Sequence, residues 1–333
     1  MPPVSAHPSR RRASALAVCA LACLLIGGAA RAADPGCHYV QGSTLKLKLL
    51  GRLHVPLVDA TINDQPVQML VDTGSQRTYV SRTLAEKLDI PLHPTDQLVL
   101  GIGGLAVTQM GRLREMTVGD SHVKNGYLPV LDDSERHFSS GGILGADFLL
   151  NQDVELALRE KRITFFHPQG CNDTFLAYWD KDAAEVLLEP FSPANRGAHF
   201  EVALNGVKVR AMIDTGAEVS TLTWDAAKRV GVTPDSTGVV RNGEQQGIGA
   251  ATIASWSAPF DSFAIGSETI KNVRISVIGQ EGARGHDDMP EMLLGTDFLN
   301  AHRVLIAMGQ QHLYLSYLGG KVFAASDAKQ AAQ

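Results

Sequence analysis

A five-residue motif occurs twice in this chain, as VDTGS at residues 71–75 and as IDTGA at residues 213–217. A single Asp-Thr-Gly would carry little information, because it arises by chance in roughly a few per cent of chains of this length. The surroundings of the motif match as well, since residues 63–90 align with residues 205–232 without a gap. The chain therefore contains an internal repeat, and its fold must give two aspartates equivalent settings.

Each aspartate of the motif, Asp72 and Asp214, is expected just past the end of an apolar strand. Both repeats enter the motif through two apolar runs separated by a turn, which in the second repeat is the hairpin signal Asn205-Gly206. A rigid sheet would hold each aspartate-bearing loop in place. The predicted strands span residues 55–62 and 67–71 in the first repeat and 199–204 and 207–213 in the second.

Short helices are predicted at the same place in both repeats, at residues 81–88 and 223–230. Ser81 and Thr223 have the residue types that favour helix N-caps. A proline follows each helix within a few residues, as is typical of a helix that ends there.

A third motif closes each repeat, as ILGADFL at residues 143–149 and LLGTDFL at residues 293–299. Its aspartates, Asp147 and Asp297, are expected to be structural N-caps of short helices that begin at the next residue. A final hairpin then follows in both repeats. These hairpins are predicted at residues 154–158 with 163–166 and at residues 304–308 with 313–317.

Glycine-rich segments lie between the motifs, as LGIGGL at residues 100–105 and QGIGA at residues 246–250. The first has β-type flanks, and the second lacks the glycine spacing before a helix that a nucleotide-binding loop requires. Both segments are predicted to be the tips of long β-hairpins.

The N-terminus has the pattern of a secretory signal peptide. Three arginines at residues 10–12 precede an apolar stretch at residues 13–30, and small residues end in ARA at residues 30–32. This pattern predicts cleavage before Ala33 and export to the periplasm or the medium. An uncleaved membrane anchor is the alternative, because about 18 apolar residues approach the length that spans a bilayer.

The charge balance argues against nucleic acid as a partner. Residues 1–32 contain four arginines and no acidic residue, so their removal from 30 basic and 35 acidic residues would leave a net charge of −9. No basic stripe then remains to neutralise phosphates. The 11 histidines are scattered and no Cys/His cluster has metal-ligand spacing, so neither a metal nor another cofactor is predicted.

Two cysteines remain after the predicted cleavage. Cys19 and Cys23 lie in the signal, whereas Cys37 and Cys171 belong to the mature chain. In an oxidising compartment, two cysteines predict one disulfide. Two free buried thiols are the alternative.

The three motifs, in the same order and present twice, resemble the retropepsin/pepsin clan of aspartic peptidases. The resemblance implies an all-β fold with short helices, in which two tandem retropepsin-like lobes form an intramolecular pseudo-dimer. The chain is similar to bacterial retropepsin-like periplasmic proteases with two fused lobes. The predicted parts are a signal peptide at residues 1–32, an extension at 33–54, lobe 1 at 55–167, a linker at 168–197, lobe 2 at 198–318 and a disordered tail at 319–333.

The resemblance also implies that Asp72 and Asp214 face each other as a catalytic pair. Two carboxylates about 3 Å apart, at an effective dielectric constant of about 20, repel by roughly 5 kcal/mol, so the pair keeps one proton. Support of the two loops is expected from Thr73, Gly74, Ser75, Thr215, Gly216 and Ala217. The glycine-rich hairpins would be flaps that contact substrate through Gly101, Ile102, Gly103, Gly247, Ile248 and Gly249.

The two aspartate loops differ at one position, where Ser75 in the first repeat corresponds to Ala217 in the second. A serine hydroxyl can donate a hydrogen bond to the adjacent carboxylate and favour its charged form. Asp72 is therefore expected to be the ionised member of the resting pair more often than Asp214.

These features predict an exported aspartic endopeptidase that acts on polypeptides. One alternative is a periplasmic protein of the same fold that binds peptides without cleaving them. Another is a structural envelope protein whose repeats serve only packing. Intact aspartates in both repeats favour the peptidase, because a protein that only binds peptides would not require two.

Overall fold

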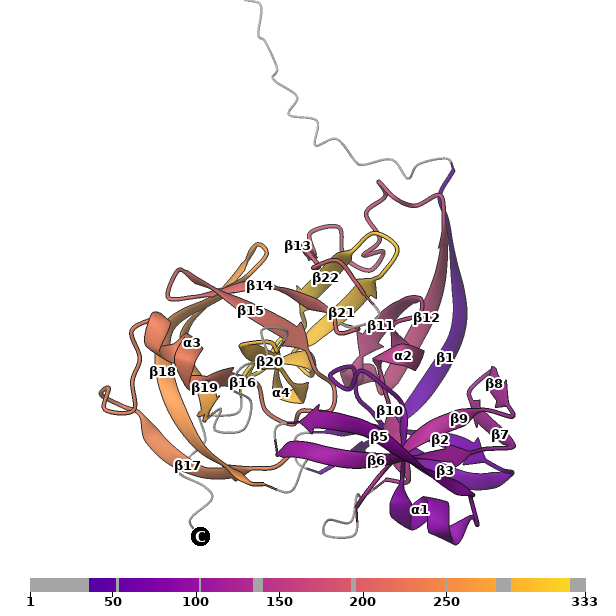
Figure 1. The fold of residues 1–333 in the computed structure, drawn as a ribbon. Helices are drawn as coiled ribbons and strands as arrows, with labels where there is room; N and C mark the ends of the chain where they lie inside the picture. The colour runs from indigo at the N-terminus through magenta and orange to yellow at the C-terminus, as the bar shows by residue number, and fades with distance from the viewer. Residues whose placement is uncertain are drawn as a thin grey trace, which may run out of the picture. The chain divides into compact units, whose positions relative to one another are not determined.

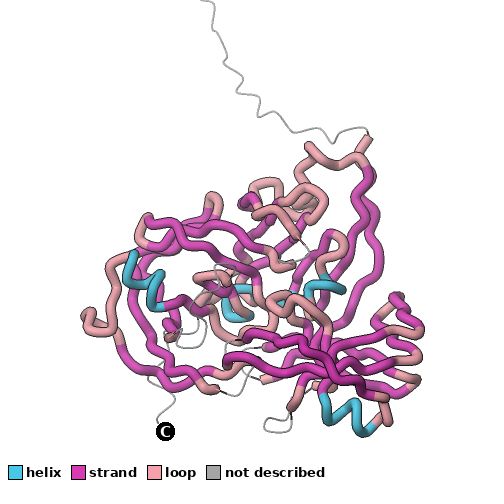
Figure 2. The backbone as a smooth tube through the Cα atoms, viewed as in Figure 1, coloured by secondary structure: helices cyan, strands magenta, loops and turns pink. Residues whose placement is uncertain are grey.

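The structure of the protein is a computed structural model, and it describes residues 36–51, 54–101, 103–133, 140–192, 196–248, 251–279 and 289–323 (Figure 1). In these segments β-strands dominate, and each α-helix has only four to six residues (Figure 2). The predicted all-β fold with short helices is confirmed. No helix in the described part of the chain is long and apolar enough to cross a membrane.

The strands around the two aspartates pair in the same way in both repeats. In the first repeat they are β3 (Gln65–Val71), β4 (Tyr79–Ser81), β9 (Tyr127–Leu131) and β10 (Gly142–Leu144). In the second they are β15 (Val207–Ile213), β16 (Thr221–Thr223), β19 (Glu268–Ile278) and β20 (Met292–Leu294). The order β3-β10-β4-β9, with parallel, antiparallel and parallel pairings, recurs as β15-β20-β16-β19. The internal repeat seen in the sequence is therefore a repeat of structure.

The strands before the motif lie where the sequence predicts them. β2 (Val55–Ile62) pairs antiparallel with β3, and β14 (His199–Leu204) pairs antiparallel with β15. Fully buried and more exposed residues alternate along β14 and at the end of β3, because one face of each of these strands lies on the core. Asp72 and Asp214 directly follow β3 and β15, so the ends of two packed strands position them.

The glycine-rich segments lie at the tips of hairpins, as predicted. β5 (Leu92–Gly101) pairs with β6 (Gly104–Arg112), and β17 (Val240–Gln245) pairs with β18 (Ile253–Ile265). β6 continues into the sheet beside β9, and β18 does so beside β19. A smaller hairpin, β7 (Glu115–Val118) with β8 (Ser121–Lys124), packs on the edge of β2.

Both predicted helices with polar N-caps are present. α1 (Arg82–Lys87) follows Ser81, whose hydroxyl accepts a hydrogen bond from the Leu84 N–H at 3.1 Å. α3 (Trp224–Arg229) follows Thr223, whose hydroxyl accepts one from the Ala226 N–H at 3.2 Å. Each cap satisfies an N–H group that the helix itself leaves unpaired.

The predicted role of Asp147 and Asp297 as N-caps is wrong. The helices of the third motif, α2 (Ala146–Leu149) and α4 (Thr296–Leu299), both begin two residues earlier than expected. Their N-caps are Gly145 and Gly295, and neither makes a side-chain cap. Both aspartates lie in the first helical turn, where their carboxylates accept hydrogen bonds from Thr78 and Ser220.

A sheet formed by both repeats joins the two halves of the chain. Its strands run in the order β13 (Ala184–Leu187), β22 (His312–Tyr317), β21 (His302–Ala307), β11 (Asp153–Ala157), β12 (Arg162–Gln169) and β1 (His38–Leu50), with a 3₁₀ turn at Leu158–Glu160 between β11 and β12. The repeats meet where β11 pairs antiparallel with β21. The N-terminal extension contributes β1, and the predicted linker contributes β13, so neither is a loose connection.

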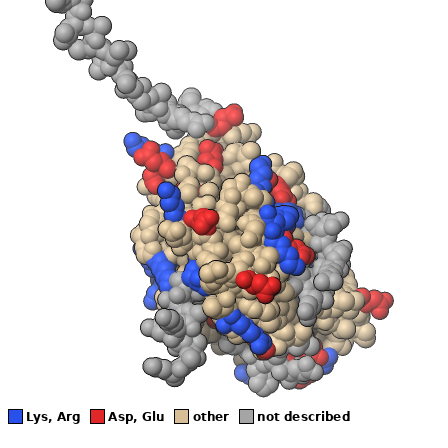
Figure 3. Space-filling model, turned by 90° about the vertical axis from the view of Figure 1, so that its left-hand side faces the viewer, with Lys and Arg blue, Asp and Glu red and all other residues tan. Residues whose placement is uncertain are grey.

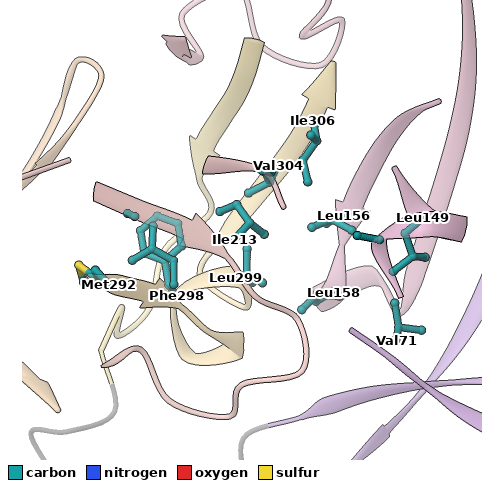
Figure 4. Close-up of a cluster of buried hydrophobic side chains, with 14 of the residues drawn as sticks. Val71, Leu149, Leu156, Leu158, Ile213, Met292, Phe298, Leu299, Val304 and Ile306 are labelled. Atoms are coloured by element: carbon teal, nitrogen blue, oxygen red, sulfur yellow. The ribbon is translucent and has the colours of Figure 1, made fainter. Parts of the chain in front are cut away.

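One hydrophobic core includes residues of both repeats. Figure 4 shows Leu156 from β11 in this cluster with Val304 and Ile306 from β21. Val71 and Ile213, which directly precede the two aspartates, are fully buried in the same cluster. The aspartate loops are therefore anchored in a core that the two repeats share.

The C-terminal segment is packed further than the sequence suggests. Val322 and Phe323 are buried, and the Phe323 ring lies edge-on to Phe263 with centroids 5.2 Å apart. These two apolar side chains complete the cluster around Phe298, so residues 322 and 323 belong to the packed fold. Residues 324–333, like the predicted signal peptide at residues 1–32, lie outside the described residues.

The predicted disulfide between Cys37 and Cys171 is present, with Cα atoms 4.5 Å apart. It links the residue before β1 to the segment after β12, beside a cluster that contains Phe166 and Tyr314. The alternative of two free thiols is therefore wrong for the oxidised protein.

Replacing both cysteines by serine is expected to lower the free energy of unfolding by about 2–4 kcal/mol, because the bond closes a long loop and restricts the unfolded chain. Urea unfolding of the oxidised wild type and of the double variant measures the difference. An unchanged midpoint and slope would contradict a stabilising role for the disulfide.

Candidate active site

Two threonines bring the aspartate loops of the two repeats together. The Thr73 hydroxyl accepts a hydrogen bond from the Thr215 N–H at 3.1 Å and donates one to the Ile213 carbonyl at 2.9 Å. The Thr215 hydroxyl likewise accepts from the Thr73 N–H at 3.0 Å and donates to the Val71 carbonyl at 2.7 Å. Both threonines are completely buried. Four reciprocal bonds thus fix one loop against the other.

The glycines of the motif allow the close approach of the two carboxyl groups. A Cβ atom at Gly74 would lie 2.5 Å from Cγ of Asp214, and one at Gly216 would overlap the carboxyl group of Asp72. Such contacts are sterically forbidden, so any side chain at these positions would push the loops apart. The repeated glycine therefore places each loop directly against the aspartate of the other.

Backbone N–H groups orient each carboxylate. Asp72 Oδ1 accepts hydrogen bonds from the N–H groups of Gly74 and Ser75, both at 2.9 Å. Asp214 Oδ1 accepts them from Gly216 at 2.9 Å and Ala217 at 3.1 Å. One oxygen of each carboxyl group is thus held by its own loop.

The two carboxyl groups share a setting that keeps a proton on the pair. Burial raises the pKa of Asp72 well above its usual value, and the charge of Asp214 raises it further. Burial also raises the pKa of Asp214, although the N–H groups of Gly216 and Ala217 oppose this shift. The two groups titrate as a unit, so the pair holds one proton at pH values where an ordinary carboxyl group is fully ionised.

The raised pKa of Asp72 predicts how the stability of the protein depends on pH. A carboxyl group whose pKa is raised by folding stabilises the native state below its unfolded pKa, and the stabilisation is lost as pH rises through the folded pKa. The Asp72→Asn variant lacks that group, so its free energy of unfolding, minus that of the wild type, is expected to increase as pH rises from about 4. Urea unfolding of both proteins across this range measures the difference, and a difference independent of pH would contradict the shared proton.

Residues of the third motif stabilise the aspartate loops through hydrogen bonds. The Thr78 hydroxyl donates to Asp147 Oδ1 at 2.7 Å and accepts from the Gly145 N–H at 3.1 Å. In the second repeat, the Ser220 hydroxyl donates to Asp297 Oδ1 at 2.6 Å and accepts from the Gly295 N–H at 3.0 Å. The sequence analysis did not predict a role for the hydroxyls of Thr78 and Ser220. Each lies six residues after its aspartate, so their equivalent spacing in the repeats was the available signal.

The proposed role of the Ser75 hydroxyl is wrong. Its Oγ donates to the Arg77 carbonyl at 3.0 Å, and only the backbone N–H of Ser75 reaches Asp72. The carbonyl lies two residues ahead in the same turn, so the hydroxyl bonds locally instead of reaching the carboxylate. The difference between Ser75 and Ala217 therefore gives no reason for Asp72 to be the ionised member of the pair.

Ser75→Ala is accordingly expected to leave the acidic limb of the pH–rate profile in place. The substitution removes one neutral hydrogen bond from the loop, which is expected to lower the free energy of unfolding by about 0.5–1.5 kcal/mol. A pH–rate profile of peptide cleavage, together with thermal unfolding, tests this. An acidic limb displaced to higher pH in Ser75→Ala would contradict this prediction, because it would show that the hydroxyl donates to the Asp72 carboxylate.

The two hairpin tips bond to each other. The Gly103 N–H donates to the Ile248 carbonyl at 2.8 Å, and the Ala251 N–H donates to the Gly103 carbonyl at 2.9 Å. A Cβ atom at Gly101 would overlap the Ile248 backbone, so the first tip needs glycine where the second crosses it. Gly247 adjoins this contact, whereas Ile102 and Gly249 of the predicted flap residues lie outside the described residues. In the described segments, no three His, Cys, Asp or Glu side chains gather as metal ligands would.

Comparison with known proteins agrees with this geometry. A family model described as Aspartyl protease matches residues 58–148 and 200–298, which together make up more than half of the chain. The chain belongs to the aspartyl protease family. Each matched segment contains one aspartate of the pair, so both repeats of this aspartyl protease match the family model.

A solved structure extends the likeness to the whole fold. The crystal structure of aspartic proteinase from Irpex lacteus is similar with a TM-score of 0.51 and 14% sequence identity, over 86% of this chain and 100% of that chain. At this identity the likeness shows a shared, pepsin-like two-lobed fold. No curated protein matches the chain.

Proposed function

We propose that this aspartyl protease is an active endopeptidase, which hydrolyses peptide bonds with a water molecule activated between Asp72 and Asp214. The observation that carries the proposal is the mutual approach of the two carboxyl groups, which the reciprocal bonds of Thr73 and Thr215 hold in place. A protein that only packed its repeats, or only bound peptides, would not need two buried carboxyl groups that share a proton. The geometry therefore favours the peptidase over both alternatives.

The chemistry uses both protonation states of the pair at once. The ionised carboxylate accepts a proton from water as the water oxygen attacks the peptide carbonyl carbon, while the protonated partner donates its proton to the carbonyl oxygen. The resulting tetrahedral diol collapses when the protonated carboxyl group gives its proton to the leaving nitrogen, the other carboxylate takes a proton from a diol hydroxyl, and the C–N bond breaks. The pair ends with one proton, as it began. The chain's own carboxyl groups supply every proton transfer.

The hairpins and the surroundings of the pair suit a polypeptide substrate. An extended chain has unpaired N–H and C=O groups that the edges of β-hairpins can bond. The two hairpin tips bond to each other through Gly103 and Ile248, so we expect them to separate before a chain enters between them. Basic and acidic side chains are interspersed on the face shown in Figure 3, which offers no basic stripe there.

Action outside the cytoplasm is part of the proposal. The disulfide between Cys37 and Cys171 is stable in an oxidising compartment such as the periplasm or the medium. The arginines and apolar stretch at the N-terminus have the composition of an export signal. N-terminal sequencing of the exported protein would find Ala33 first if the signal is cleaved as proposed.

The test is cleavage of a denatured protein in the presence and absence of a peptide whose central bond is replaced by a hydroxyethylene group. This group mimics the tetrahedral intermediate, so it is expected to inhibit cleavage by competition with the substrate. Binding of the analogue without any cleavage would support the non-cleaving alternative. Neither binding nor cleavage would support a purely structural protein.

A further inference from the structure

The tip of the second lobe's hairpin bonds to the first lobe through its backbone. The Gly103 N–H of the first tip donates to the Ile248 carbonyl of the second at 2.8 Å. The Ala251 N–H of the second tip donates back to the Gly103 carbonyl at 2.9 Å. Gly103 is buried. Two hydrogen bonds to one buried residue therefore hold the two tips together.

The Ile248 side chain adds an apolar contact with the first lobe. It packs against a cluster of three residues that are each at most 4% exposed, Tyr79, Leu131 and Ile143. Val99 and Ala106, a cross-strand pair of the first hairpin, pack against the same cluster. Ile248 thus covers apolar surface that belongs to the other lobe.

This cluster adjoins the aspartate pair. Ile143 is followed by Leu144, whose carbonyl accepts a hydrogen bond from the Asp72 N–H at 3.0 Å. Burial raises the pKa of Tyr79 to about 12, and the charge of Asp72 adds to the rise. Ile248 therefore packs against a cluster that lies next to a reacting carboxyl group.

Gly101 of the first hairpin lies directly against Ile248. A Cβ atom at Gly101 would overlap both the carbonyl oxygen and the Cβ atom of Ile248. The backbone at Gly101 does not itself require glycine, because its φ lies outside the left-handed region. The contact with Ile248 is therefore what excludes a side chain at this position.

We propose that Ile248 is an autoinhibitory latch, which holds the two hairpin tips together in the ligand-free protein and leaves the Tyr79 cluster when a polypeptide enters between them. The inference rests on the proposed function and adds a regulation of its site. The apolar contact and the bond to Gly103 belong to one residue, so they are released together. Polypeptides then bind only to the open fraction of the protein, and the latch lowers the apparent affinity by that fraction.

Two substitutions weaken the latch from opposite sides. Ile248→Ala removes most of the apolar contact and keeps the carbonyl that accepts the Gly103 N–H. Gly101→Ala places a methyl group where Ile248 lies in the closed form, so it favours separation of the tips. Each variant is expected to raise the open fraction about tenfold.

Amide hydrogen exchange of the mature protein without ligand, followed by NMR, measures the open fraction. The Gly103 N–H is expected to exchange with water only when the tips separate, and about tenfold faster in both variants than in the wild type. Leu105→Ala is the matched control and should exchange as the wild type does. Leu105 is 60% exposed, and its neighbour Ala106 contacts the cluster, so Leu105 faces away from it.

Three results of the exchange experiment would overturn the latch. They are an unprotected Gly103 N–H in the wild type, an exchange rate that Ile248→Ala leaves unchanged, and an equal acceleration by Leu105→Ala. None of them depends on whether the protein cleaves peptides.

Stopped-flow binding of a fluorescent peptide with a reduced, non-hydrolysable central bond tests the link to the site. At saturating peptide, the observed rate is expected to level off at the rate of latch opening. This plateau should be about tenfold higher in Ile248→Ala and unchanged in Leu105→Ala. A wild-type rate that rises in proportion to peptide concentration, without a plateau, would overturn the autoinhibition. Exchange and binding as expected, without cleavage of the same peptide with a normal bond, would instead contradict the proposed function alone.

Discussion

Asp72→Asn and Asp214→Asn are each expected to lower kcat/KM for peptide cleavage by about 10³-fold or more. An amide can neither accept the proton of water nor donate one to the carbonyl oxygen, so removing either carboxyl group ends the cycle. The loops should stay in place, because the Thr73 and Thr215 bonds do not involve the carboxylates. The measurement is cleavage kinetics together with thermal unfolding of each variant.

Asp225→Asn is a suitable control for these variants. Asp225 lies on α3 in the same lobe as Asp214, and its side chain is exposed, with Lys228 at 3.8 Å. Removal of this charge should leave both kcat/KM and stability close to wild type. Substantial turnover in either Asp72→Asn or Asp214→Asn would contradict a mechanism with two carboxyl groups.

The largest loss of stability is expected from Glu155→Ala, about 3–5 kcal/mol. Glu155 is completely buried on β11, where Arg162 Nη1 donates to Oε1 at 2.5 Å and Arg303 Nη2 to Oε2 at 3.0 Å. The Tyr178 hydroxyl donates to Oε2 at 2.6 Å. The variant would leave two guanidinium groups at the joint between the repeats without their shared anion, and urea unfolding measures the cost.

Glu201→Ala is the matched control, because Glu201 also forms an ion pair, with Lys208 at 2.8 Å, but on the surface. Exposed pairs contribute no more than about 1 kcal/mol. Similar losses in the two variants would show that the Glu155 cluster does not hold the repeats together. A larger loss for Glu155→Ala, with separate unfolding of the two lobes, would show that it does.

The repeat made much of the fold predictable from the sequence. Strands β2, β14 and β15 have the predicted bounds, and Ser81 and Thr223 cap the predicted helices. Local patterns sufficed here, because alternating burial and N-cap chemistry depend on neighbours in the chain. The duplicated motif likewise identified the aspartates that the structure brings together.

Contacts between distant segments were not predictable in the same way. The charge of Glu155 in a strand gave no sign that Arg162 and Arg303 would bury it, because Arg303 follows it by almost the whole second repeat. The Ser75 hydroxyl had two acceptors within reach, and only the geometry of the turn decides for the Arg77 carbonyl. Asp147 had the residue type of a cap, yet the helix begins before it and Thr78 takes its carboxylate.

The most direct test of the account is the appearance of new N-termini in a denatured protein incubated with the purified mature chain. Mass spectrometry of the digest, from acidic to neutral pH, is compared for the wild type and for Asp72→Asn. The account predicts discrete internal cleavages by the wild type and none by the variant. The absence of new N-termini with the wild type at every pH, or the same fragments with Asp72→Asn, would contradict the proposed peptidase.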